Sequence, residues 1–337
     1  MKTPKTGNNP FLNLARRAEG INGKVRFMGQ VLAATARVCF LGGVNGDDRK
    51  LIATTLKEMN RALKIFAPHR DTRKVVIWGS SRVKNTSPEY KMALEFSEKI
   101  TKEGFMVITG AGSGIMEAAN RGAGRKGFGI NIDIPMEQEP NPYIKPERLL
   151  HLRYFFTRKL TFIRESDAIV LFPGGFGTND ETFEILILAQ TGKIMPMPIV
   201  LVKPESGAYW KNWMKFVEGA MLKNRYISED DLKLFTAANS VDQAVNGVTG
   251  FYNVYHSMKY VGPLTIIRLN RPLSDKNIEA LNQKFKDILV GGRIESSAPT
   301  AEEIKDNDYL DLPRLSMTFN KGKFGRLYDM IRAINTF

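Results

Sequence analysis

Short runs of consecutive apolar residues alternate with longer amphipathic stretches along the middle of the chain, from Val75 to about Ser257. Uninterrupted apolar runs of this length are typical of strands that helices cover on both faces of a sheet. Because strands and helices alternate, we expect an α/β fold with a Rossmann-like, doubly wound parallel sheet. The predicted strands are Val75–Trp78, Met106–Thr109, Gly129–Ile132, Ala168–Phe172 and Ile199–Val202.

The two flanking regions follow other patterns. Residues 1–71 predict an N-terminal helical region, because Leu51, Thr55, Met59, Leu63 and Phe66 recur at helical spacing. The segment from Val31 to Val44 is too short and too interrupted for a membrane span, which favours a buried helix. Residues 72–258 form the predicted nucleotide-binding core. Residues 259–337 predict a small C-terminal α/β unit with strands at Leu264–Leu269, Arg293–Ala298 and Arg314–Phe319, and helices at Ser274–Leu289 and Lys323–Ile334.

Charge and composition narrow the functional classes. The net charge is +14, which favours anionic partners. Five of the basic residues gather before a glycine-rich motif and indicate a local anion site: Arg148, Arg153, Arg158, Lys159 and Arg164. No nucleic-acid-binding motif accompanies the other basic stretches, so a nucleic-acid partner is not expected. The single cysteine, Cys39, excludes an internal disulfide and favours a reducing cytoplasm. With one cysteine and three histidines, the sequence gives no pattern for a metal site. The start of the chain, Met1 to Gly20, has no apolar core of a signal peptide.

Three glycine-containing loops follow three of the predicted strands. The first begins with Gly79 and Ser80, the second is Gly110-Ala111-Gly112-Ser113-Gly114, and the third is Pro173-Gly174-Gly175-Phe176-Gly177-Thr178. In a parallel sheet these loops leave at the same, carboxyl edge, where open α/β sheets bind ligands. Glycine lets backbone N–H groups approach an anion, and the helix that follows adds unsatisfied donors. We therefore expect a phosphate-bearing ligand at this edge.

Two common nucleotide signatures do not fit. The sequence has no G-x-x-x-x-G-K-[ST] motif, which argues against a P-loop NTPase. The dinucleotide pattern G-x-G-x-x-G fails after Gly110, because Ile115 stands at the third glycine position. Asp133 stands where a ribose-binding carboxylate would follow, so a dinucleotide site stays open as an alternative.

The segment from Pro173 to Glu181 matches the P-G-G-x-G-T-x-x-E signature, and the pair Arg158-Lys159 precedes it by one strand. Together with the glycine-rich stretch from Gly110 to Ala123, these motifs resemble the LONELY GUY (LOG) family, long labelled "lysine decarboxylase". The resemblance covers roughly residues 73 to 257. The segments Gly129 to Ile132 and Glu137 to Tyr143 are more similar to the longer bacterial members than to the plant type.

The resemblance implies an activity and an assembly. Members of the family hydrolyse the N-glycosidic bond of nucleoside 5′-monophosphates and release free base and ribose 5-phosphate. Plant and actinobacterial members act on cytokinin ribotides, and the longer bacterial members act on ordinary purine and pyrimidine monophosphates. For this chain the resemblance implies an AMP-like substrate, a homodimer and no organic cofactor.

Glu181 is the residue at which the resemblance places the catalytic carboxylate. There it would stabilise a ribose ring with oxocarbenium character or orient the attacking water. Thr178 and Glu181 also have the spacing of a capping box, so a purely structural role is the alternative, and both roles can hold together. Arg158 would bind phosphate or assist the leaving base, and the sequence does not choose between these roles. Glu184, one helical turn after Glu181, would hold the ribose hydroxyls or be solvated.

The remaining candidate residues would bind substrate. Lys159 is a supporting residue, and Met116 would face the base or the core. The loop residues expected to bind substrate are Gly79, Ser80, Gly110, Gly112, Ser113, Gly114, Gly174, Gly175, Gly177 and Thr178. Of these, the 5′-phosphate would be held by Gly112, Ser113, Gly114, Gly175, Gly177 and Thr178. Phe155, Phe156 and Phe162 are expected in the core. His151 is interpreted as structural.

Two other functional classes compete with hydrolysis. A non-catalytic nucleotide sensor or carrier could use the same fold, although such a protein needs neither Glu181 nor Arg158. A pyridoxal-phosphate decarboxylase, as the older family label suggests, has less support, because no lysine is set apart as a Schiff-base residue.

Overall fold

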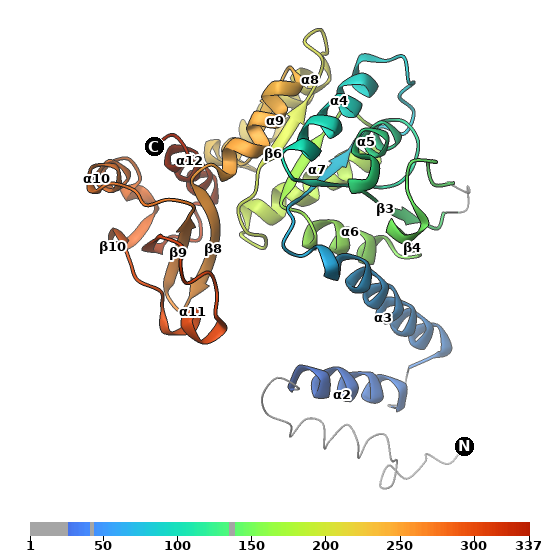
Figure 1. Ribbon diagram of the computed structural model, residues 1–337, viewed down its shortest axis with the longest axis horizontal. Coiled ribbons are helices and arrows are strands. Elements are labelled where there is room, and N and C mark those ends of the chain that lie inside the picture. Colours follow the sequence, from blue (N-terminus) through green and yellow to red (C-terminus); the bar gives the residue numbers. More distant parts are fainter. Residues whose placement is uncertain (1–25, 41–43, 135–138) are drawn as a thin grey trace. The chain divides into compact units, whose positions relative to one another are not determined.

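The computed structural model describes residues 26–40, 44–134 and 139–337 (Figure 1). The chain divides into two compact units, Met1–Lys64 and Ile65–Phe337, and each is described by itself. The first 20 residues, examined above for a signal peptide, lie outside the described residues.

Helices α2 (Arg26–Phe40) and α3 (Gly46–Phe66) precede the parallel sheet. The helix expected from the spacing of residues 51 to 66 is confirmed, and it begins at Gly46 because Asn45 caps it. The Asp48 amide donates to the Asn45 side chain at 2.9 Å, and the Asn45 amide donates back to the Asp48 carboxylate at 3.1 Å. Helix α2 confirms a helix near Val31, but Val31 and Leu32 are about half exposed, so the prediction of a buried helix is wrong there.

A seven-stranded parallel sheet confirms the predicted fold class. Its strands have the order β4-β3-β2-β1-β5-β6-β7, and every pairing is parallel. The predicted strands are confirmed, whereas β4 and β7 were not predicted. The strands are β1 (Lys74–Trp78), β2 (Met106–Thr109), β3 (Gly127–Ile132), β4 (Leu149–Leu152), β5 (Ala168–Leu171), β6 (Ile199–Val202) and β7 (Thr236–Ala238).

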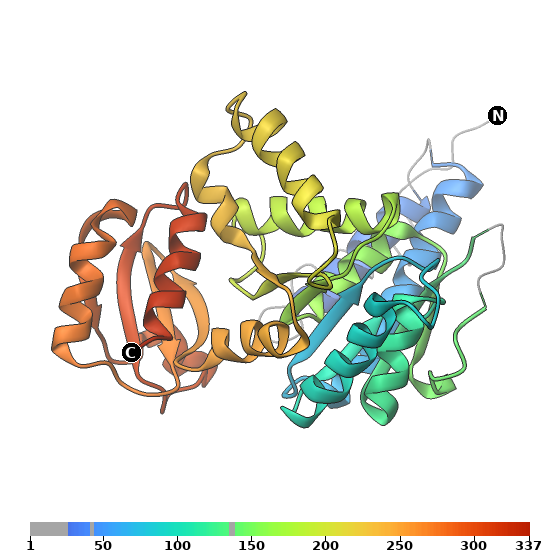
Figure 2. The same cartoon turned by 90° about the horizontal axis from the view of Figure 1, so that it is seen from above.

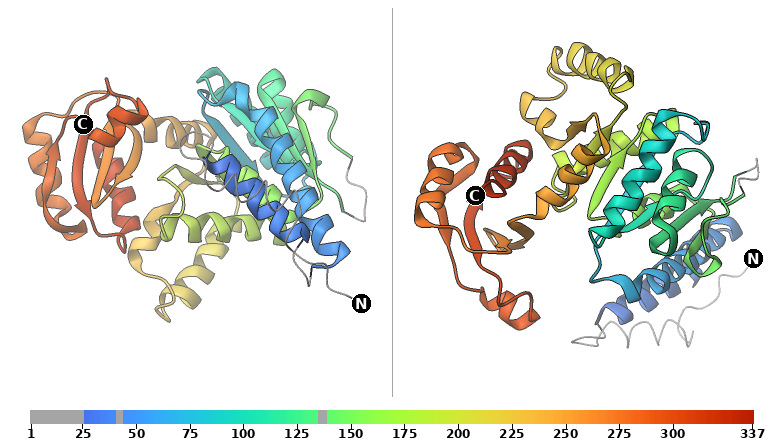
Figure 3. Two further views of the ribbon diagram at one scale, coloured as in Figure 1. Left: turned by 90° about the horizontal axis from the view of Figure 1, so that it is seen from below. Right: turned by 45° about the horizontal axis from the view of Figure 1, so that its top comes forward.

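Helices cover both faces of this sheet (Figures 2 and 3). Residues alternate between the two faces of a strand, so Val75 and Ile77 of β1 face one layer of helices and Trp78 faces the other. The first layer is α4 (Pro88–Lys102), α5 (Ile115–Ala123) and α9 (Val241–Thr249), whose buried side chains share one core with β1. On the opposite face the Trp78 ring meets Phe162 of α6 (Phe155–Arg164) edge-on, at 5.6 Å between ring centroids. Helices α7 (Phe176–Gln190) and α8 (Tyr209–Phe216) follow β5 and β6 in the chain.

A second sheet of four antiparallel strands follows, in the order β10-β11-β9-β8. The predicted strands and helices of the C-terminal unit are confirmed, but the sheet begins at Tyr255, before the expected boundary at residue 259. Asn335, near the end of the chain, is bonded to the start of this sheet, because its side-chain oxygen accepts from the amides of Val254 (2.7 Å) and Tyr255 (2.9 Å). The elements are β8 (Tyr255–Val261), β9 (Leu264–Leu269), α10 (Asp275–Lys284), β10 (Leu289–Ser296), α11 (Ala301–Asp306), β11 (Arg314–Phe319) and α12 (Phe324–Ile334).

Among the described residues, no helix has both the length and the apolar character needed to cross a membrane.

Candidate functional site

The three glycine loops meet at the carboxyl edge of β2, β1 and β5, which are neighbours in the sheet. After β1 the chain continues to one side of it through β2, and β5 lies on its other side, so the strand order reverses between β1 and β5. Trp78, the last residue of β1, pairs with Leu171, the last residue of β5, so the first and third loops leave the sheet at the same level. Open α/β sheets bind ligands at such a reversal point.

Backbone hydrogen bonds tie the loops to one another. The Ser80 amide donates to the Pro173 carbonyl, and the Ile115 amide donates to the Ser80 carbonyl, each at 3.1 Å. Gly114, at φ +65°, lies so close to the first loop that a Cβ there would overlap the carbonyl oxygen of Ser80. A Cβ at Gly174 would overlap the Thr178 hydroxyl in the same way. Packing therefore requires glycine at both positions, and at Gly114 the backbone conformation favours it as well.

A cavity of about 720 Å³ opens between the first and third loops, α6 and α8. This volume lies within the usual range for small-molecule sites, about 300–1,000 Å³. Helix α7 begins at its edge, and the first amides of a helix have no acceptor within the helix. The cavity is lined by Trp78, Gly79, Ser80, Ser81, Arg82, Met116, Phe155, Arg158, Gly174, Gly175, Phe176, Gly177, Thr178, Asn179, Asp180, Glu181 and Tyr209.

Arg158 reaches this cavity from α6. Its Nε donates to the Ile130 carbonyl at 2.9 Å, and its guanidinium lies over the Phe162 ring, 5.1 Å from the centroid. A Cβ at Gly110 would overlap one terminal nitrogen, so the absence of a side chain at Gly110 makes room for the fork. Burial lowers the pKa of Arg158, and the nearby Glu181 charge opposes that shift. The two terminal nitrogens donate to no other described residue, which leaves them available to an anion.

Glu181 of α7 is the buried carboxylate of the site. Only 7% of its surface is exposed, and its Oε2 has no hydrogen-bond partner among the described residues. Burial raises the pKa of Glu181 from 4.5 to about 7, against the charges of Lys159 and Arg158 and together with those of Glu184 and Asp180. A carboxylate held at this pKa beside a cavity is typical of a functional group rather than of a structural one.

The structure contradicts the capping-box alternative for Thr178 and Glu181. Helix α7 begins at Phe176 with Gly175 as its N-cap residue, and no side chain caps it. Thr178 and Glu181 therefore lie inside the helix, where a capping box cannot form. The sequence placed the start of the helix too late because glycine, rather than threonine, occupies the cap.

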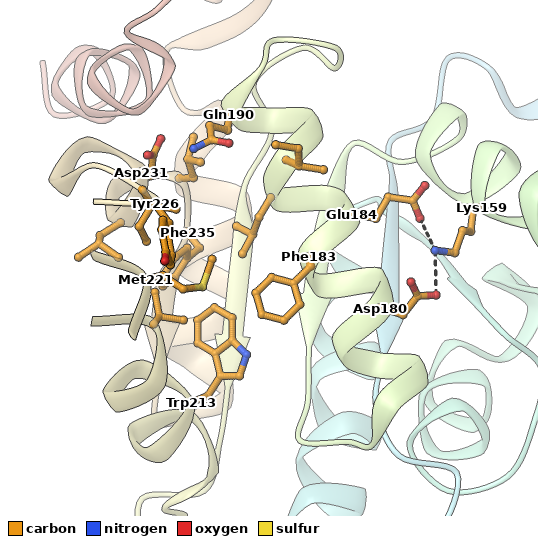
Figure 4. A pocket seen from close by; sticks show the side chains of 16 residues that line it. Lys159, Asp180, Phe183, Glu184, Gln190, Trp213, Met221, Tyr226, Asp231 and Phe235 are labelled. Atoms are coloured by element: carbon orange, nitrogen blue, oxygen red, sulfur yellow. Dashed lines mark ion pairs between the residues drawn. The ribbon is translucent and has the colours of Figure 1, made fainter. Parts of the chain in front are cut away.

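Lys159 of α6 and Glu184 of α7 do not line this cavity. The Lys159 Nζ pairs with Asp180 at 2.8 Å and with Glu184 at 2.9 Å (Figure 4). Both residues line a second, mainly apolar cavity of about 650 Å³ between α7 and the segment from α8 to Phe235. Only Asp180 lines both cavities, so the ion pairs of Lys159 form part of the boundary between them.

The predicted residues fall into three groups. Nine line the site cavity: Gly79, Ser80, Met116, Arg158, Gly174, Gly175, Gly177, Thr178 and Glu181. Gly110, Gly112, Ser113 and Gly114 form the loop behind it, and the Ser113 hydroxyl donates to the Ser81 carbonyl at 2.8 Å. Lys159 and Glu184 line the neighbouring cavity. His151 is exposed on β4 and lines neither cavity.

Sequence reasoning missed two kinds of lining residue. Ser81 and Arg82 directly follow Gly79, so their place after a strand end could have identified them. Tyr209 comes from α8 and carries no motif, yet its hydroxyl donates to the Gly174 carbonyl at 2.7 Å and accepts from Asn179 at 2.9 Å. The expectation that Phe155 and Phe156 belong to the core is wrong, because both are about half exposed, whereas Phe162 is fully buried.

Residues 114–248 match a protein family whose description is "Possible lysine decarboxylase". The matched part contains the helix starts of α5 and α7, Arg158 and Glu181. The resemblance to the LOG family is confirmed. The third glycine loop lies within the matched residues, and the match begins at Gly114, the last residue of the second loop.

Curated relatives at low identity include enzymes of two names. A pyrimidine/purine nucleotide 5′-monophosphate nucleosidase of Escherichia coli (strain K12) is 27% identical over 164 residues, which cover 44% of this chain and 35% of that protein. A probable cytokinin riboside 5′-monophosphate phosphoribohydrolase of Oryza sativa subsp. japonica is 26% identical over 196 residues, 56% of this chain and 87% of that protein. The chain thus matches only about a third of the length of the bacterial nucleosidase.

Solved structures with a related chain path include a molybdenum cofactor binding protein from Rippkaea orientalis. Its TM-score is 0.39 at 18% identity, over 53% of this chain and 95% of that one. A molybdenum cofactor carrier protein from Chlamydomonas reinhardtii has a TM-score of 0.38 at 19% identity, over 53% and 96% of the two chains.

The raised pKa of Glu181 predicts that Glu181→Gln stabilises the protein at alkaline pH. The folded state holds the proton more tightly than the unfolded state between pH 4.5 and 7, so the ionised side chain destabilises the fold above pH 7. The ionised carboxylate lowers the free energy of unfolding by about 3 kcal/mol. Thermal unfolding followed by circular dichroism should show a higher Tm for the glutamine variant at pH 8 and equal Tm values near pH 4.5. The control is Asp180→Asn, at an exposed carboxylate paired with Lys159, which should give no such gain. A glutamine variant at position 181 whose Tm equals that of the wild type at both pH values would contradict the raised pKa of Glu181.

Proposed function

We propose that this chain hydrolyses the N-glycosidic bond of nucleoside 5′-monophosphates, giving free base and ribose 5-phosphate. The observation that carries the proposal is the buried carboxylate of Glu181, whose Oε2 has no partner in the described part of the chain and which shares one cavity with the Arg158 guanidinium and the first turn of α7. The printed names of the curated relatives support it, because both kinds of enzyme act on a ribose 5′-monophosphate that carries a base.

The two ends of the cavity suit the two ends of such a substrate. The glycine loops and the first amides of α7 supply N–H donors to the 5′-phosphate, and the helix end adds a partial positive charge. Glu181 lies further along α7 than these amides, so its carboxylate would face the ribose rather than the phosphate. This order along the helix separates the anionic group of the substrate from the anionic group of the protein.

Hydrolysis breaks the bond between C1′ and the base nitrogen and forms a bond between C1′ and the oxygen of water. The bonding electrons leave with the base, which takes a proton, and the water loses one. As the bond breaks, positive charge develops on the ribose ring, and the Glu181 carboxylate would stabilise it or accept the proton of water. Arg158, with two free terminal nitrogens, would hold the phosphate or the departing base.

The decarboxylase alternative gains no support from the cavity. The residues that line it in the described part of the chain include no lysine, and the nearby Lys159 is engaged by two carboxylates. A nucleotide carrier would bind the same ligand without turnover, so kinetic measurements separate it from the proposed enzyme. A cytoplasmic location, inferred from the single cysteine, stays a prediction.

The phosphate-binding loops predict a strong preference for AMP over adenosine. Each charge-assisted hydrogen bond to the phosphate contributes about 1.5–3 kcal/mol, so several should raise kcat/KM for AMP by orders of magnitude. Release of free adenine from the two substrates, separated by chromatography, measures this ratio. Equal rates on both substrates would show that the loops do not bind phosphate.

A second kinetic prediction concerns the charge of Glu181. Glu181→Gln should lower kcat by at least about a hundredfold, the usual size of acid–base or electrostatic effects, while AMP binding persists or tightens. Because the carboxylate must be ionised, the wild-type kcat/KM should fall as the pH drops below about 7. The matched control is Glu184→Gln, which neutralises a carboxylate of the same helix that lies on the other cavity. If Glu184→Gln loses as much activity as Glu181→Gln, the catalytic assignment moves to Glu184.

We also propose that the chain forms a homodimer through α6 and α7. Large apolar side chains of these two helices are exposed, between 37% and 97% of their surface: Phe155, Phe156, Leu160, Phe176, Phe183 and Ile187. Exposed apolar side chains of this size and number are typical of an interaction site. Light scattering at micromolar concentration should give about twice the chain mass of 37.9 kDa. The substitution Leu160→Asp should lower the measured mass toward that of a single chain. Wild-type protein that is entirely 37.9 kDa would contradict the dimer.

A further inference from the structure

The second glycine loop is held from behind by three buried polar side chains that do not line the site cavity. Thr109 ends β2, Asn120 lies on α5, and Asn141 lies in the segment before β4. Their exposed fractions are 0%, 0% and 6%. Within the loop they hold, Ala111 is fully buried and has φ +61°, a conformation that residues other than glycine seldom adopt. Neither the family motif nor the glycine pattern explains these polar residues.

Hydrogen bonds connect the three side chains to the loop and to one another. The Asn141 side-chain amide donates to the Gly112 carbonyl at 3.0 Å and to the Asn120 Oδ1 at 2.9 Å. The backbone amide of Asn141 donates to the Ala111 carbonyl at 2.7 Å. The Thr109 hydroxyl donates to the Asn120 Oδ1 at 2.6 Å and accepts from the Ala111 amide at 2.9 Å. Both N–H groups of the Asn141 side chain are thus used, and the loop cannot rotate without breaking buried bonds.

The direction of these bonds fixes where the loop amides point. In a trans peptide the carbonyl and the following N–H point in opposite directions, and the described backbone contains no cis peptide. The carbonyls of Ala111 and Gly112 both point toward Asn141. The N–H groups of Gly112 and Ser113 therefore point away from it.

These two amides donate to no other described residue, although Gly112 is buried. Buried amides are nearly always paired, so the free N–H of the buried Gly112, beside that of the exposed Ser113, indicates a ligand that accepts from them. Successive amides in a turn with one left-handed residue form an anion-binding concavity. The loop borders the site, because the Ser113 hydroxyl bonds to Ser81 and Gly110 lies against Arg158 and Met116, all of which line the cavity.

We propose that Asn141 is a positioning residue of the site: by holding the carbonyls of Ala111 and Gly112, it aims the N–H groups of Gly112 and Ser113 at the 5′-phosphate of the substrate. This inference rests on the proposed function, since it assumes a phosphate at this edge of the sheet. Asn141 itself does not touch the substrate. Its loss should therefore weaken recognition of the phosphate and leave recognition of the nucleoside unchanged.

The test compares binding of AMP and adenosine to full-length protein by calorimetry. Asn141→Ala keeps the backbone N–H bond to the Ala111 carbonyl and removes the side-chain bond to the Gly112 carbonyl. It should raise the Kd for AMP at least tenfold, because the charge-assisted bond from the Ser113 N–H loses its alignment, and should change the Kd for adenosine less than twofold. The matched control is Asn335→Ala, which removes an asparagine that bonds backbone groups in the same way near the second sheet. It should alter neither Kd. Circular dichroism confirms that each variant is folded.

A second pair of variants keeps the test decisive if Asn141→Ala does not fold. Thr109→Val has the same shape but removes the hydroxyl that accepts from Ala111, whereas Thr109→Ser keeps it. The valine variant should lose AMP affinity at least tenfold and the serine variant should not. Folded variants that bind AMP as the wild type does, or that lose AMP and adenosine affinity equally, would overturn the inference.

The same measurements separate this inference from the proposed function. Wild-type protein that binds AMP more tightly than adenosine but releases no adenine contradicts hydrolysis and leaves the role of Asn141 to be decided by the variants. Wild-type protein that binds both equally overturns the phosphate site and the inference together.

Discussion

The three glycine loops approach one another so closely at the carboxyl edge of the parallel sheet that two of their glycines, Gly114 and Gly174, leave no space for a side chain. A Cβ at Gly114 would overlap the carbonyl of Ser80, and one at Gly174 would overlap Thr178. This close approach lets two short hydrogen-bonded links, from Ser80 to Pro173 and from Ile115 to Ser80, tie the loops into one surface. The position of α7, and with it the position of Glu181, depends on that surface.

The burial of Glu181 lowers the stability of the fold and at the same time leaves the carboxylate available to a ligand. A carboxylate without a hydrogen bond to one of its oxygens destabilises the folded state when it is ionised. The same lack of partners keeps it free to act on a ligand. Lys159 and Arg158 limit the destabilisation by lowering the pKa of Glu181, and Asp180 and Glu184 oppose them. A balance of this kind at a cavity is typical of active sites, which are seldom optimised for stability.

Much of the core could be predicted from the sequence, because its strands are continuous apolar runs and its glycine loops follow them directly. Strands β4 and β7 escaped prediction because neither is a continuous run of large apolar residues: His151 interrupts the first, and the second is a threonine and two alanines. The start of α7 was misplaced because a glycine cap gives a weaker signal than threonine. The motif residues that line the cavity were identified, and their roles stay predictions.

Other parts of the site depend on tertiary structure that no local pattern encodes. Lys159 of α6 and Glu184 of α7 line the neighbouring cavity because of the way these two helices are rotated relative to each other. Spacing within one helix does not determine that rotation. Tyr209 reaches the third loop from α8, some thirty residues beyond the motif. Asn120 and Asn141 meet only because β2, α5 and the segment before β4 converge behind one loop.

The lining of the site is unevenly distributed along the chain. Apart from Tyr209, the residues that line the cavity lie between Trp78 and Glu181. The segment from Lys203 to Phe235, which carries Tyr209 and much of the neighbouring apolar cavity, is therefore a natural module for exchange with relatives. A chimaera joined after Val202 and again before Thr236, at the ends of two neighbouring strands, would replace one wall of the site and keep the phosphate loops and Glu181 intact. Ligand selectivity could then be varied through a piece of the chain that the motifs do not touch.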